Sequence, residues 1–278
     1  MTSVTDVKRG KGGRSSFSGL VTTVFGGTGF VARSLVNQLG KIGSQIIIPY
    51  RGDPYRHKEL KLAGDLGQVL FIPYHLKEDH SIRKAIQHSN IVINLVSKDS
   101  ETPNFSFEDI HVDFPLRLIE LCKEVGVEKF VHFSALNTGT SSGEHVIKGG
   151  SKWLKTKARG EELVREHCPE AIIFKPSDIY GSEYDRFIQH YGQSYRRMKP
   201  DPNTALVPLW RSGRETIKQP VHVTNVAQGV IAALLDPACA GQTFDVVGPN
   251  RYRLDDLVRW IYLHMRYETD NVHFAPIF

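Results

Sequence analysis

The stretch that decides the fold is residues 20–40, which read LVTTVFGGTGFVARSLVNQLG. A short β-branched and aromatic run leads into the turn Gly26-x-x-Gly29-x-x-Ala32, and an amphipathic segment follows. Glycines let the backbone turn sharply and approach a pyrophosphate, and the next helix presents free N–H groups at its positive end. Because the motif follows a strand and opens a helix, it predicts a dinucleotide-binding turn. The alternative is a purely structural tight turn.

The same alternation of strand and helix continues along the chain. Continuous apolar runs, typical of strands buried on both faces, occur at 20–25, 45–50, 69–74, 91–96, 129–134 and 171–175. Helical segments are expected at about 29–40, 55–63, 78–88, 106–125 and 152–167. The series predicts an α/β fold, namely a Rossmann-like doubly wound parallel sheet with a small C-terminal α/β region on the substrate side.

We expect three segments along the chain. Residues 1–18 form a basic flexible arm, residues 19–176 form the dinucleotide-binding domain, and residues 177–278 form a smaller region on the sheet edge. In this last region, VHVTNVAQGVIAALLD predicts a helix capped by Thr224 or Asn225. GQTFDVVG predicts a strand and RLDDLVRWIYLHM another helix.

Composition argues against several classes of function. The formal charge of +5 at pH 7 is dispersed along the chain, whereas a nucleic-acid partner would favour a clustered basic face. No apolar run approaches the roughly 18–20 residues of a transmembrane helix. Cys122, Cys168 and Cys239 are far apart and lack metal-ligand spacing, so they predict thiols in a reducing compartment and no metal site.

The tip of the second expected strand reads IIIPYRGD, and in this fold that tip recognises the adenosine ribose. Arg51 stands at the tip, with Tyr50 before it and Asp53 two residues beyond. An arginine pairs with the 2′-phosphate of NADP, whereas an acidic residue accepts from the ribose hydroxyl of NAD. The sequence therefore favours NADPH. NAD would require Asp53 to reach back to the ribose, and the ordinary alternative is a solvated loop arginine.

Two further strand ends are expected to line the cofactor. His75 and Leu76 follow the third strand, where the adenine edge is usually covered. Asn94, Leu95 and Val96 end the fourth strand. Buried apolar strand ends would look the same in sequence, and the two interpretations are compatible.

These features resemble the extended and atypical short-chain dehydrogenases/reductases. In that family a serine ends the fifth strand and a Tyr-x-x-x-Lys pair lies on the next helix. Here Ser134 and the pair Trp153 and Lys157 occupy those positions. The resemblance implies that the lysine holds the nicotinamide ribose and the tyrosine transfers a proton. An indole N–H does not titrate usefully, so we expect no catalytic residue and regard all three positions as degenerate.

Longer stretches carry a closer resemblance. GSQIIIPYRGD, QHSNIVINLV, GVEKFVHFS, PEAIIFKPSDIYG and VGPNRYRLDDLVRWI are similar to the nucleotide-binding accessory subunits of mitochondrial NADH:ubiquinone oxidoreductase, respiratory complex I. The resemblance covers about residues 10–263 and implies a bound NADPH that supports assembly and stability outside the electron path. It also implies a place on the matrix side of the inner mitochondrial membrane, among other complex I subunits where the peripheral and membrane arms join.

The chain departs from that family in two places. The tyrosine that the family commonly retains is Trp153 here, which implies a pseudo-enzyme. Family members continue well beyond RYRLDDLVRWI, so we expect the C-terminal region to be truncated. The basic arm and residues 184–199 are candidate contacts for other subunits or anionic lipid head groups. The alternative for both segments is a solvated basic loop.

Two other functions stay open. An active NADP-dependent reductase or epimerase would need another proton donor, for which Tyr180, Tyr184 and His145 are the candidates. A redox sensor would exchange NADPH and NADP⁺ reversibly. The expected cofactor-binding residues are Gly26, Gly27, Thr28, Gly29, Phe30, Val31, Arg51, His75, Leu76, Leu95, Val96, Ser134, Lys157, Pro176, Ser177 and Ile179.

Overall fold

The structure is a computed structural model that describes residues 17–138, 150–181, 185–193, 205–266 and 272–277. Most of the arm expected over residues 1–18 lies outside these residues. The chain divides into two compact units. The first comprises Met1–Ser141, Ser151–Lys175 and Thr224–Asp245, and the second comprises Ser142–Gly150, Pro176–Val223 and Val246–Phe278.

A seven-stranded sheet in the order β11-β6-β5-β4-β1-β2-β3 forms the centre of the first unit. Its strands are β1 (Val21–Phe25), β2 (Gln45–Tyr50), β3 (Val69–Pro73), β4 (Ile91–Asn94), β5 (Lys129–Phe133), β6 (Ile172–Pro176) and β11 (Thr243–Val246). From β3 across to β6, each strand pairs in parallel with its neighbour. The predicted Rossmann-like parallel sheet is confirmed, with β11 as a strand added to the six expected.

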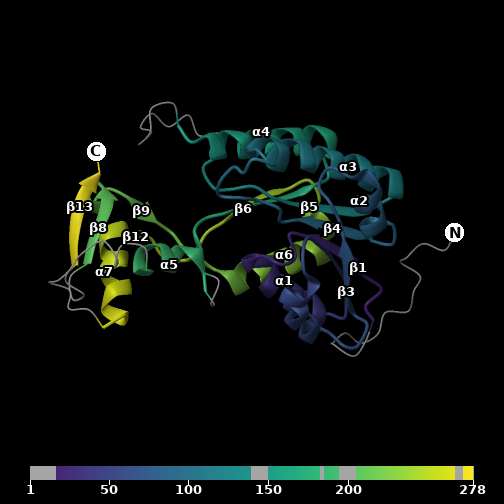
Figure 1. Ribbon diagram of the computed structural model, residues 1–278, viewed down its shortest axis with the longest axis horizontal. Coiled ribbons are helices and arrows are strands. Elements are labelled where there is room, and N and C mark those ends of the chain that lie inside the picture. Colours follow the sequence, from purple (N-terminus) through teal and green to yellow (C-terminus); the bar gives the residue numbers. More distant parts are fainter. Residues whose placement is uncertain (1–16, 139–149, 182–184, 194–204, 267–271, 278) are drawn as a thin grey trace. The chain divides into compact units, whose positions relative to one another are not determined.

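Helices cover both faces of this sheet. In Figure 1, α2, α3 and α4 lie on one face and α1 and α6 on the other. Their bounds are α1 (Phe30–Lys41), α2 (Asp79–Ile86), α3 (Phe114–Val125), α4 (Lys152–His167) and α6 (Val223–Leu235). Short helical turns are η2 (Pro54–Ala63), η3 (Asp109–Asp113) and η6 (Pro237–Cys239). Among the described residues, no helix is both long and apolar enough to cross a membrane.

The helix expected over 106–125 is interrupted. Residues Asp109–Asp113 form a π-helical turn, and regular α-helix begins only at Phe114. Pro115 has no N–H to donate to the carbonyl of His111 four residues earlier, so the regular ladder breaks there. A Cβ on Gly160 would lie 1.9 Å from that carbonyl oxygen, so only glycine lets α4 pack this closely. The helix expected over 55–63 also differs from a regular α-helix, because residues Pro54–Ala63 form a 3-10 helix.

The chain returns to the first unit after residue 223, although we expected one continuous C-terminal region from residue 177. The apolar helix α6 buries a face that includes Val226 and Val230, and the Ile173 N–H donates to the Gln242 carbonyl at the start of β11 (3.0 Å). Only packing against the sheet can bury so apolar a helix. The capping prediction was wrong, because Thr224 and Asn225 lie inside α6.

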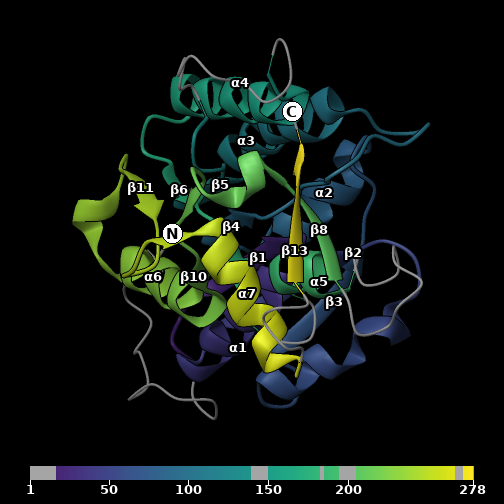
Figure 2. The same cartoon turned by 90° about the vertical axis from the view of Figure 1, so that its left-hand side faces the viewer.

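In its described residues, the second unit contains three short strand pairs and two α-helices. Its elements are β7 (Ile179–Tyr180), α5 (Arg186–Gln193), β8 (Ala205–Trp210), η5 (Arg211–Gly213), β9 (Ile217–Lys218), β10 (Val221–His222), β12 (Tyr252–Arg253), α7 (Leu254–His264) and β13 (Val272–Ile277). The pairs are β7 with β10, β9 with β12, and β8 with β13. Figure 2 shows β13 beside β8. The core of the second unit contains Val207, Leu209, Leu254, Val258, Tyr262 and Val272.

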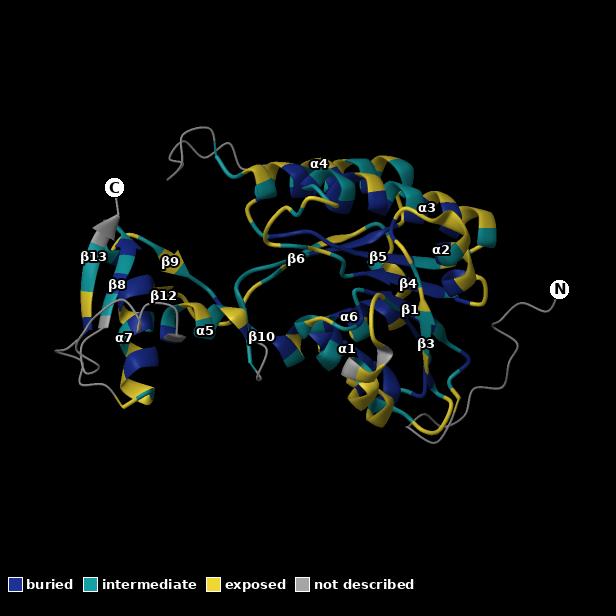
Figure 3. Cartoon of the chain, viewed as in Figure 1, coloured by how far each residue is buried: buried dark blue, intermediate teal, exposed yellow. Residues whose placement is uncertain are grey.

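The core of the first unit lies between the sheet and its helices. Figure 3 shows the strand interiors as buried and the outer helix faces as exposed. Phe25, Ile93, Phe114 and Leu118 are each exposed by 1% or less. Apolar burial of this kind stabilises by about 25 cal/mol per Å² removed from water, and it holds the strand ends in fixed positions.

Candidate functional site

The glycine turn lies against the end of β4. Gly26 has a φ of +75°, and a Cβ there would lie 2.9 Å from the Leu95 carbonyl carbon and 3.1 Å from the Val96 nitrogen. A Cβ on Gly27 would lie 2.8 Å from the Val24 carbonyl oxygen. The structure therefore brings the turn together with Leu95 and Val96, at the point where the strand order reverses and ligands bind in such sheets.

The first turn of α1 is open to an anion. Gly29 precedes the helix, its N–H donates to the Gly26 carbonyl (3.0 Å), and no side chain caps the helix. The first turn begins with Phe30 and Val31 and contains no acidic residue. Its leading N–H groups have no acceptor inside the helix, and no carboxylate competes for them. Thr28 is half-buried between the glycines.

Arg51 is exposed at the tip of β2, and its guanidinium carbon lies 5.4 Å from the centre of the Phe105 ring. Among the described residues it forms no ion pair with a carboxylate. Asp53, the acidic alternative, accepts the Tyr55 N–H at 2.9 Å and caps the start of η2. Within the described part of the chain, the guanidinium at this tip has no carboxylate partner, whereas the Asp53 carboxylate is engaged.

The end of β3 contributes one exposed ring and one core residue. His75 is exposed, and its ring centre lies 5.9 Å from that of Phe105. Leu76 is only 3% exposed and packs in the main hydrophobic core. Phe105, in the connection between β4 and η3, was not singled out from the sequence, where a lone phenylalanine in a polar loop carries no signal.

Lys157 on α4 is buried, with 3% of its surface exposed. Its ammonium donates to the Phe133 carbonyl at 3.0 Å and lies 5.8 Å from the Trp153 ring centre. Burial lowers the pKa of Lys157 from 10.5 to about 8. An ammonium has three N–H donors, so hydroxyl groups of a ligand could accept from those left over.

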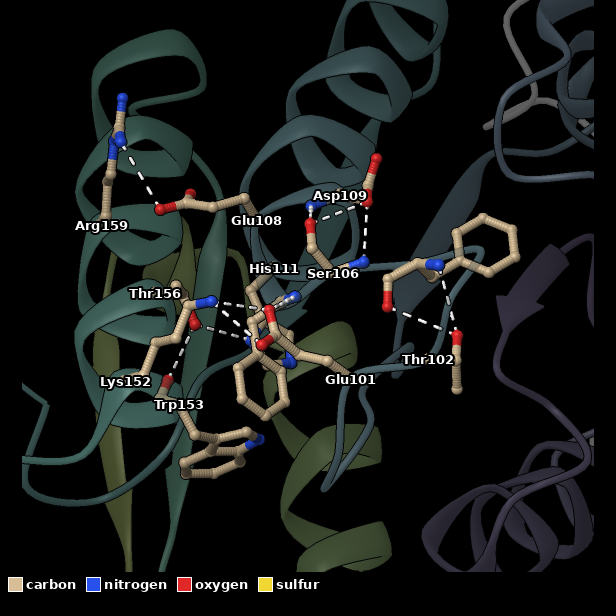
Figure 4. A network of polar contacts seen from close by, with 12 residues as sticks. Glu101, Thr102, Ser106, Glu108, Asp109, His111, Lys152, Trp153, Thr156 and Arg159 are labelled. Carbon is tan, nitrogen blue, oxygen red and sulfur yellow. Dashed lines mark hydrogen bonds and ion pairs between the residues drawn. The ribbon is translucent and has the colours of Figure 1, made fainter.

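Trp153 is tied to the segment that follows β4. Its indole N–H donates to the Lys98 carbonyl at 2.8 Å. Next to it, Lys152 donates to both carboxylate oxygens of Glu101 (2.8 and 3.0 Å). One turn further along α4, Thr156 contacts His111 Nδ1 at 3.0 Å (Figure 4). The position of the family's phenol is thus an attachment point for this segment.

Ser134 is also engaged within the protein. Its hydroxyl donates to a Glu161 carboxylate oxygen at 2.7 Å, and its N–H donates to the Phe174 carbonyl. The same Glu161 oxygen accepts from the Thr138 hydroxyl (2.8 Å), and the other pairs with Lys175 at 3.3 Å. Glu161 lies four residues after Lys157, a spacing that places both on one helix face. Sequence analysis did not single out Glu161.

Two buried histidines lie beside Lys157 and were missed from the sequence. Burial, and then the charge of Lys157, lower the pKa of His111 and of His132 to about 3, so both are neutral at pH 7. The Asn94 carbonyl accepts the Val96 N–H, so its amide donates to His132 Nδ1 (3.3 Å). His132 then carries its hydrogen on Nε2, a buried atom without a partner among the described residues.

The remaining predicted residues belong to the second unit. Ser177 donates its N–H to Val246 and its hydroxyl to the Gln219 carbonyl (2.6 Å), and Ile179 pairs with Val221. Pro176 ends β6. Tyr180 contributes to a cavity of about 440 Å³ whose aromatic lining also includes Phe187, Tyr252 and Trp260. His145 and Tyr184 lie outside the described residues.

The sheet order and the glycine turn at its switch point define a Rossmann-like α/β protein. Residues 22–248 match the model of the NAD dependent epimerase/dehydratase family. The chain belongs to this family, and within it to the group named NADH dehydrogenase (ubiquinone) 1 alpha subcomplex subunit 9. This confirms the family resemblance drawn from the sequence.

Two curated relatives and one solved structure illustrate the match. The mitochondrial subunit 9 of Mus musculus is 48% identical over 272 residues, which cover 98% of this chain and 68% of the relative. The mitochondrial NADH-ubiquinone oxidoreductase 40 kDa subunit of Neurospora crassa is 37% identical, covering 88% of this chain and 60% of the relative. The chain thus spans about two thirds of the length of these relatives.

Structural similarity extends to a bacterial enzyme. The dTDP-glucose 4,6-dehydratase of Bacillus anthracis, solved in complex with NAD, superposes with a TM-score of 0.71 and 16% identity. The match covers 93% of this chain and 85% of that chain. At this identity the similarity supports the fold alone.

Proposed function

We propose that this protein is a non-catalytic, NADPH-binding accessory subunit of mitochondrial respiratory complex I that supports assembly and stability. The contrast between Lys157 and its neighbours carries the proposal. Lys157 is a buried cation with N–H donors to spare, whereas the groups that would transfer a proton or orient a substrate are engaged elsewhere. Ser134 donates to Glu161, and Trp153 donates to Lys98.

The residues present fit a dinucleotide. The Gly26 turn and the open first turn of α1 would hold the pyrophosphate, Lys157 would hold the nicotinamide ribose, and Arg51 the adenosine end. Bound NADPH would offer a hydride at its nicotinamide, but an indole at position 153 supplies no proton to match it. Binding can therefore persist without turnover.

NADPH is favoured over NADH by the two side chains at the tip of β2. The engaged Asp53 carboxylate leaves the ribose hydroxyl of NADH without an acidic acceptor there. The guanidinium of Arg51, which has no carboxylate partner among the described residues, suits a 2′-phosphate, because arginine can bind a phosphate in a bidentate manner. The family description supports the broader nicotinamide nucleotide class.

The cellular role rests on the names of the relatives. The mouse and Neurospora proteins are named as mitochondrial subunits of this oxidoreductase. If this chain has the same role as these relatives, its partners are other complex I subunits at the junction of the peripheral and membrane arms. That junction lies on the matrix side of the inner membrane, where anionic lipid head groups are further candidate contacts. A bound cofactor would stabilise the subunit by mass action, by about 4 kcal/mol at 1,000 times its dissociation constant.

Binding and turnover should be measured on the same purified chain. We expect tight NADPH binding by calorimetry and no NADPH oxidation with carbonyl or quinone compounds. Arg51→Gln should weaken NADPH binding about 30-fold, because a charge-assisted contact is lost, with little effect on NADH. Arg83→Gln is the matched control, because Arg83 is an exposed arginine paired with Glu124 on the α2–α3 side. Saturable NADPH oxidation by the native chain would overturn the non-catalytic assignment and favour an active reductase using Tyr180, Tyr184 or His145.

A further inference from the structure

Side chains from three connections at the carboxyl edge of the sheet meet on the ring of Phe105. Arg51 follows β2, His75 and Lys77 follow β3, and Phe105 lies beyond β4. The Arg51 guanidinium carbon is 5.4 Å and the Lys77 ammonium 5.2 Å from the ring centre. The His75 ring centre lies 5.9 Å away, tilted by 46°. One neutral ring therefore contacts two permanent cations and an imidazole.

The backbone of Phe105 is held firmly. The Thr102 N–H donates to the Phe105 carbonyl (2.9 Å), and the Phe105 N–H donates back to Thr102 (3.2 Å). The next residue, Ser106, donates its N–H and its hydroxyl to Asp109, each at 2.7 Å. Figure 4 shows these contacts on the same segment that Lys152 joins to α4. The ring is thus presented by a closed turn that is attached to the fold on both sides.

Charge in this cluster is only partly compensated. Lys77 pairs with Asp109 at 2.8 Å, which holds the pKa of that carboxyl down at about 2. Arg51 has no such carboxylate among the described residues. Because each cation lies little more than 5 Å from one ring centre, the two are separated by no more than about one Debye length at 0.1 M salt. A doubly charged anion between them would relieve their repulsion.

The position of the cluster suggests which anion it suits. In this fold the tip of the second strand faces the adenosine ribose, and Arg51 stands at that tip. A phosphate on the ribose would meet Arg51 first. The ammonium of Lys77, with N–H donors beyond the one that Asp109 takes, would meet it from the neighbouring strand.

We propose that Phe105 is a positioning residue that holds Arg51 and Lys77 as a paired site for adenosine 2′-phosphate. An uncharged side chain then sets the preference for a phosphorylated nucleotide. A ring face attracts a cation by about 0.5–1 kcal/mol at an exposed site, and it orders two long flexible side chains before the phosphate arrives. The proposal rests on the proposed nucleotide-binding function and names the residues that confer its phosphate selectivity.

Leucine and tyrosine at position 105 separate this role from simple packing. Phe105→Leu keeps an apolar side chain but removes the ring face, whereas Phe105→Tyr keeps both. The dissociation constants of NADPH, NADH and 2′,5′-ADP should be measured for the native chain, both variants and Lys77→Gln, with the melting temperature of each. Phe274→Leu is the matched control, because the Arg259 guanidinium carbon lies 4.7 Å from the Phe274 ring centre within the second unit.

We expect Phe105→Leu to lower the ratio of NADPH to NADH affinity about fivefold, since two cation contacts are lost. Lys77→Gln should do the same, and 2′,5′-ADP should weaken in parallel with NADPH. Phe105→Tyr and Phe274→Leu should leave the ratio unchanged. An unchanged ratio in Phe105→Leu, while Arg51→Gln still loses NADPH, would overturn this inference and leave the proposed function standing. Absence of NADPH binding by the native chain would instead overturn the proposed function.

Discussion

Two regions at the carboxyl edge of the sheet differ. The polar groups at the tips of β1 and β2 are available to a ligand, whereas most polar side chains on the face of α4 beside β5 form hydrogen bonds within the protein. Around β1 and β2, the first turn of α1 is uncapped and Arg51 lacks a carboxylate partner among the described residues. On α4, Trp153 donates to Lys98, and Glu161 accepts from Ser134. Lys157 also donates to the Phe133 carbonyl, but its ammonium has further N–H donors.

Under the proposed function, this difference would allow the fold to lose its chemistry and keep its ligand. No large rearrangement is needed, because each catalytic position need only find an acceptor inside the protein. Once Trp153 and Ser134 form such bonds, they stabilise the fold by about 1 kcal/mol each instead of serving a substrate. The tips of β1 and β2 could not be altered in this way without loss of the proposed nucleotide, which would stabilise the fold when bound.

The largest effect is expected at the glycine turn that follows β1. Gly26→Ala should lower NADPH affinity by about 100-fold or more and destabilise the fold by several kcal/mol, because its Cβ would overlap Leu95 in a strained backbone conformation. Calorimetry and thermal unfolding would measure both. Gly67→Ala is the control, since Gly67 has a similar φ of +80° but no atom within 4 Å of an added Cβ. Equal effects in the two variants would mean that backbone strain alone, and not the close approach, governs the turn.

The next effect concerns the buried lysine on α4. The pKa of Lys157 falls from 10.5 to about 8 on folding, so between these values the unfolded chain retains a proton that the folded chain has lost. The free energy of unfolding should therefore rise with pH across this window, by up to about 3 kcal/mol relative to Lys157→Met. Denaturant titrations at pH 8, 9 and 10.5 test this.

Lys129→Met is the matched control for that series, because Lys129 is half-buried and also donates to a backbone carbonyl, that of Leu234 (2.7 Å). It should follow the native chain in its pH dependence. Parallel curves for the native chain and Lys157→Met would show that the pKa of Lys157 does not change on folding, and that the ammonium is better solvated than its burial indicates.

A smaller effect is expected at the lost phenol. Trp153→Tyr should not restore NADPH oxidation, because Ser134 remains bonded to Glu161. It should instead destabilise the fold by about 1–2 kcal/mol, since the Lys98 carbonyl loses its donor. Trp260→Tyr serves as control, because Trp260 is 54% exposed and should cost little. Turnover in Trp153→Tyr would show that one substitution separates this chain from an active enzyme, and that Ser134 can exchange its partner.

The smallest effect is expected at Ser134. Ser134→Ala should cost about 1 kcal/mol of stability and change NADPH affinity less than twofold, because its hydroxyl serves Glu161. Thr138→Val, which removes the other hydroxyl on the same carboxylate oxygen, should behave alike. A selective loss of NADPH affinity in Ser134→Ala would show that this hydroxyl contacts the ligand. It would also weaken the contrast between the tips of β1 and β2 and the face of α4.

The glycine turn and the place of Arg51 in the fold could be predicted from sequence because their signals are local. Gly26 needs a positive φ that other residues resist, and residues 20–40 contain a strand, a turn and a helix in order. Arg51 could be located because a strand tip follows directly from an apolar run. The hydrogen-bond partners of Ser134 and Trp153 could not be predicted, because they are distant in sequence. Ser134 and Glu161 lie 27 residues apart, and Trp153 and Lys98 lie 55 residues apart.

By itself, the sequence determined the parallel sheet, the glycine turn and the positions of Trp153 and Lys157, because steric limits and apolar periodicity act over a few residues. The tertiary structure alone decided that α6 and β11 join the first unit, that Phe105 contacts both Arg51 and Lys77, and that Glu161 engages Ser134. These outcomes depend on which distant surfaces pack together, and many sequences with the same local pattern would pack their polar side chains differently.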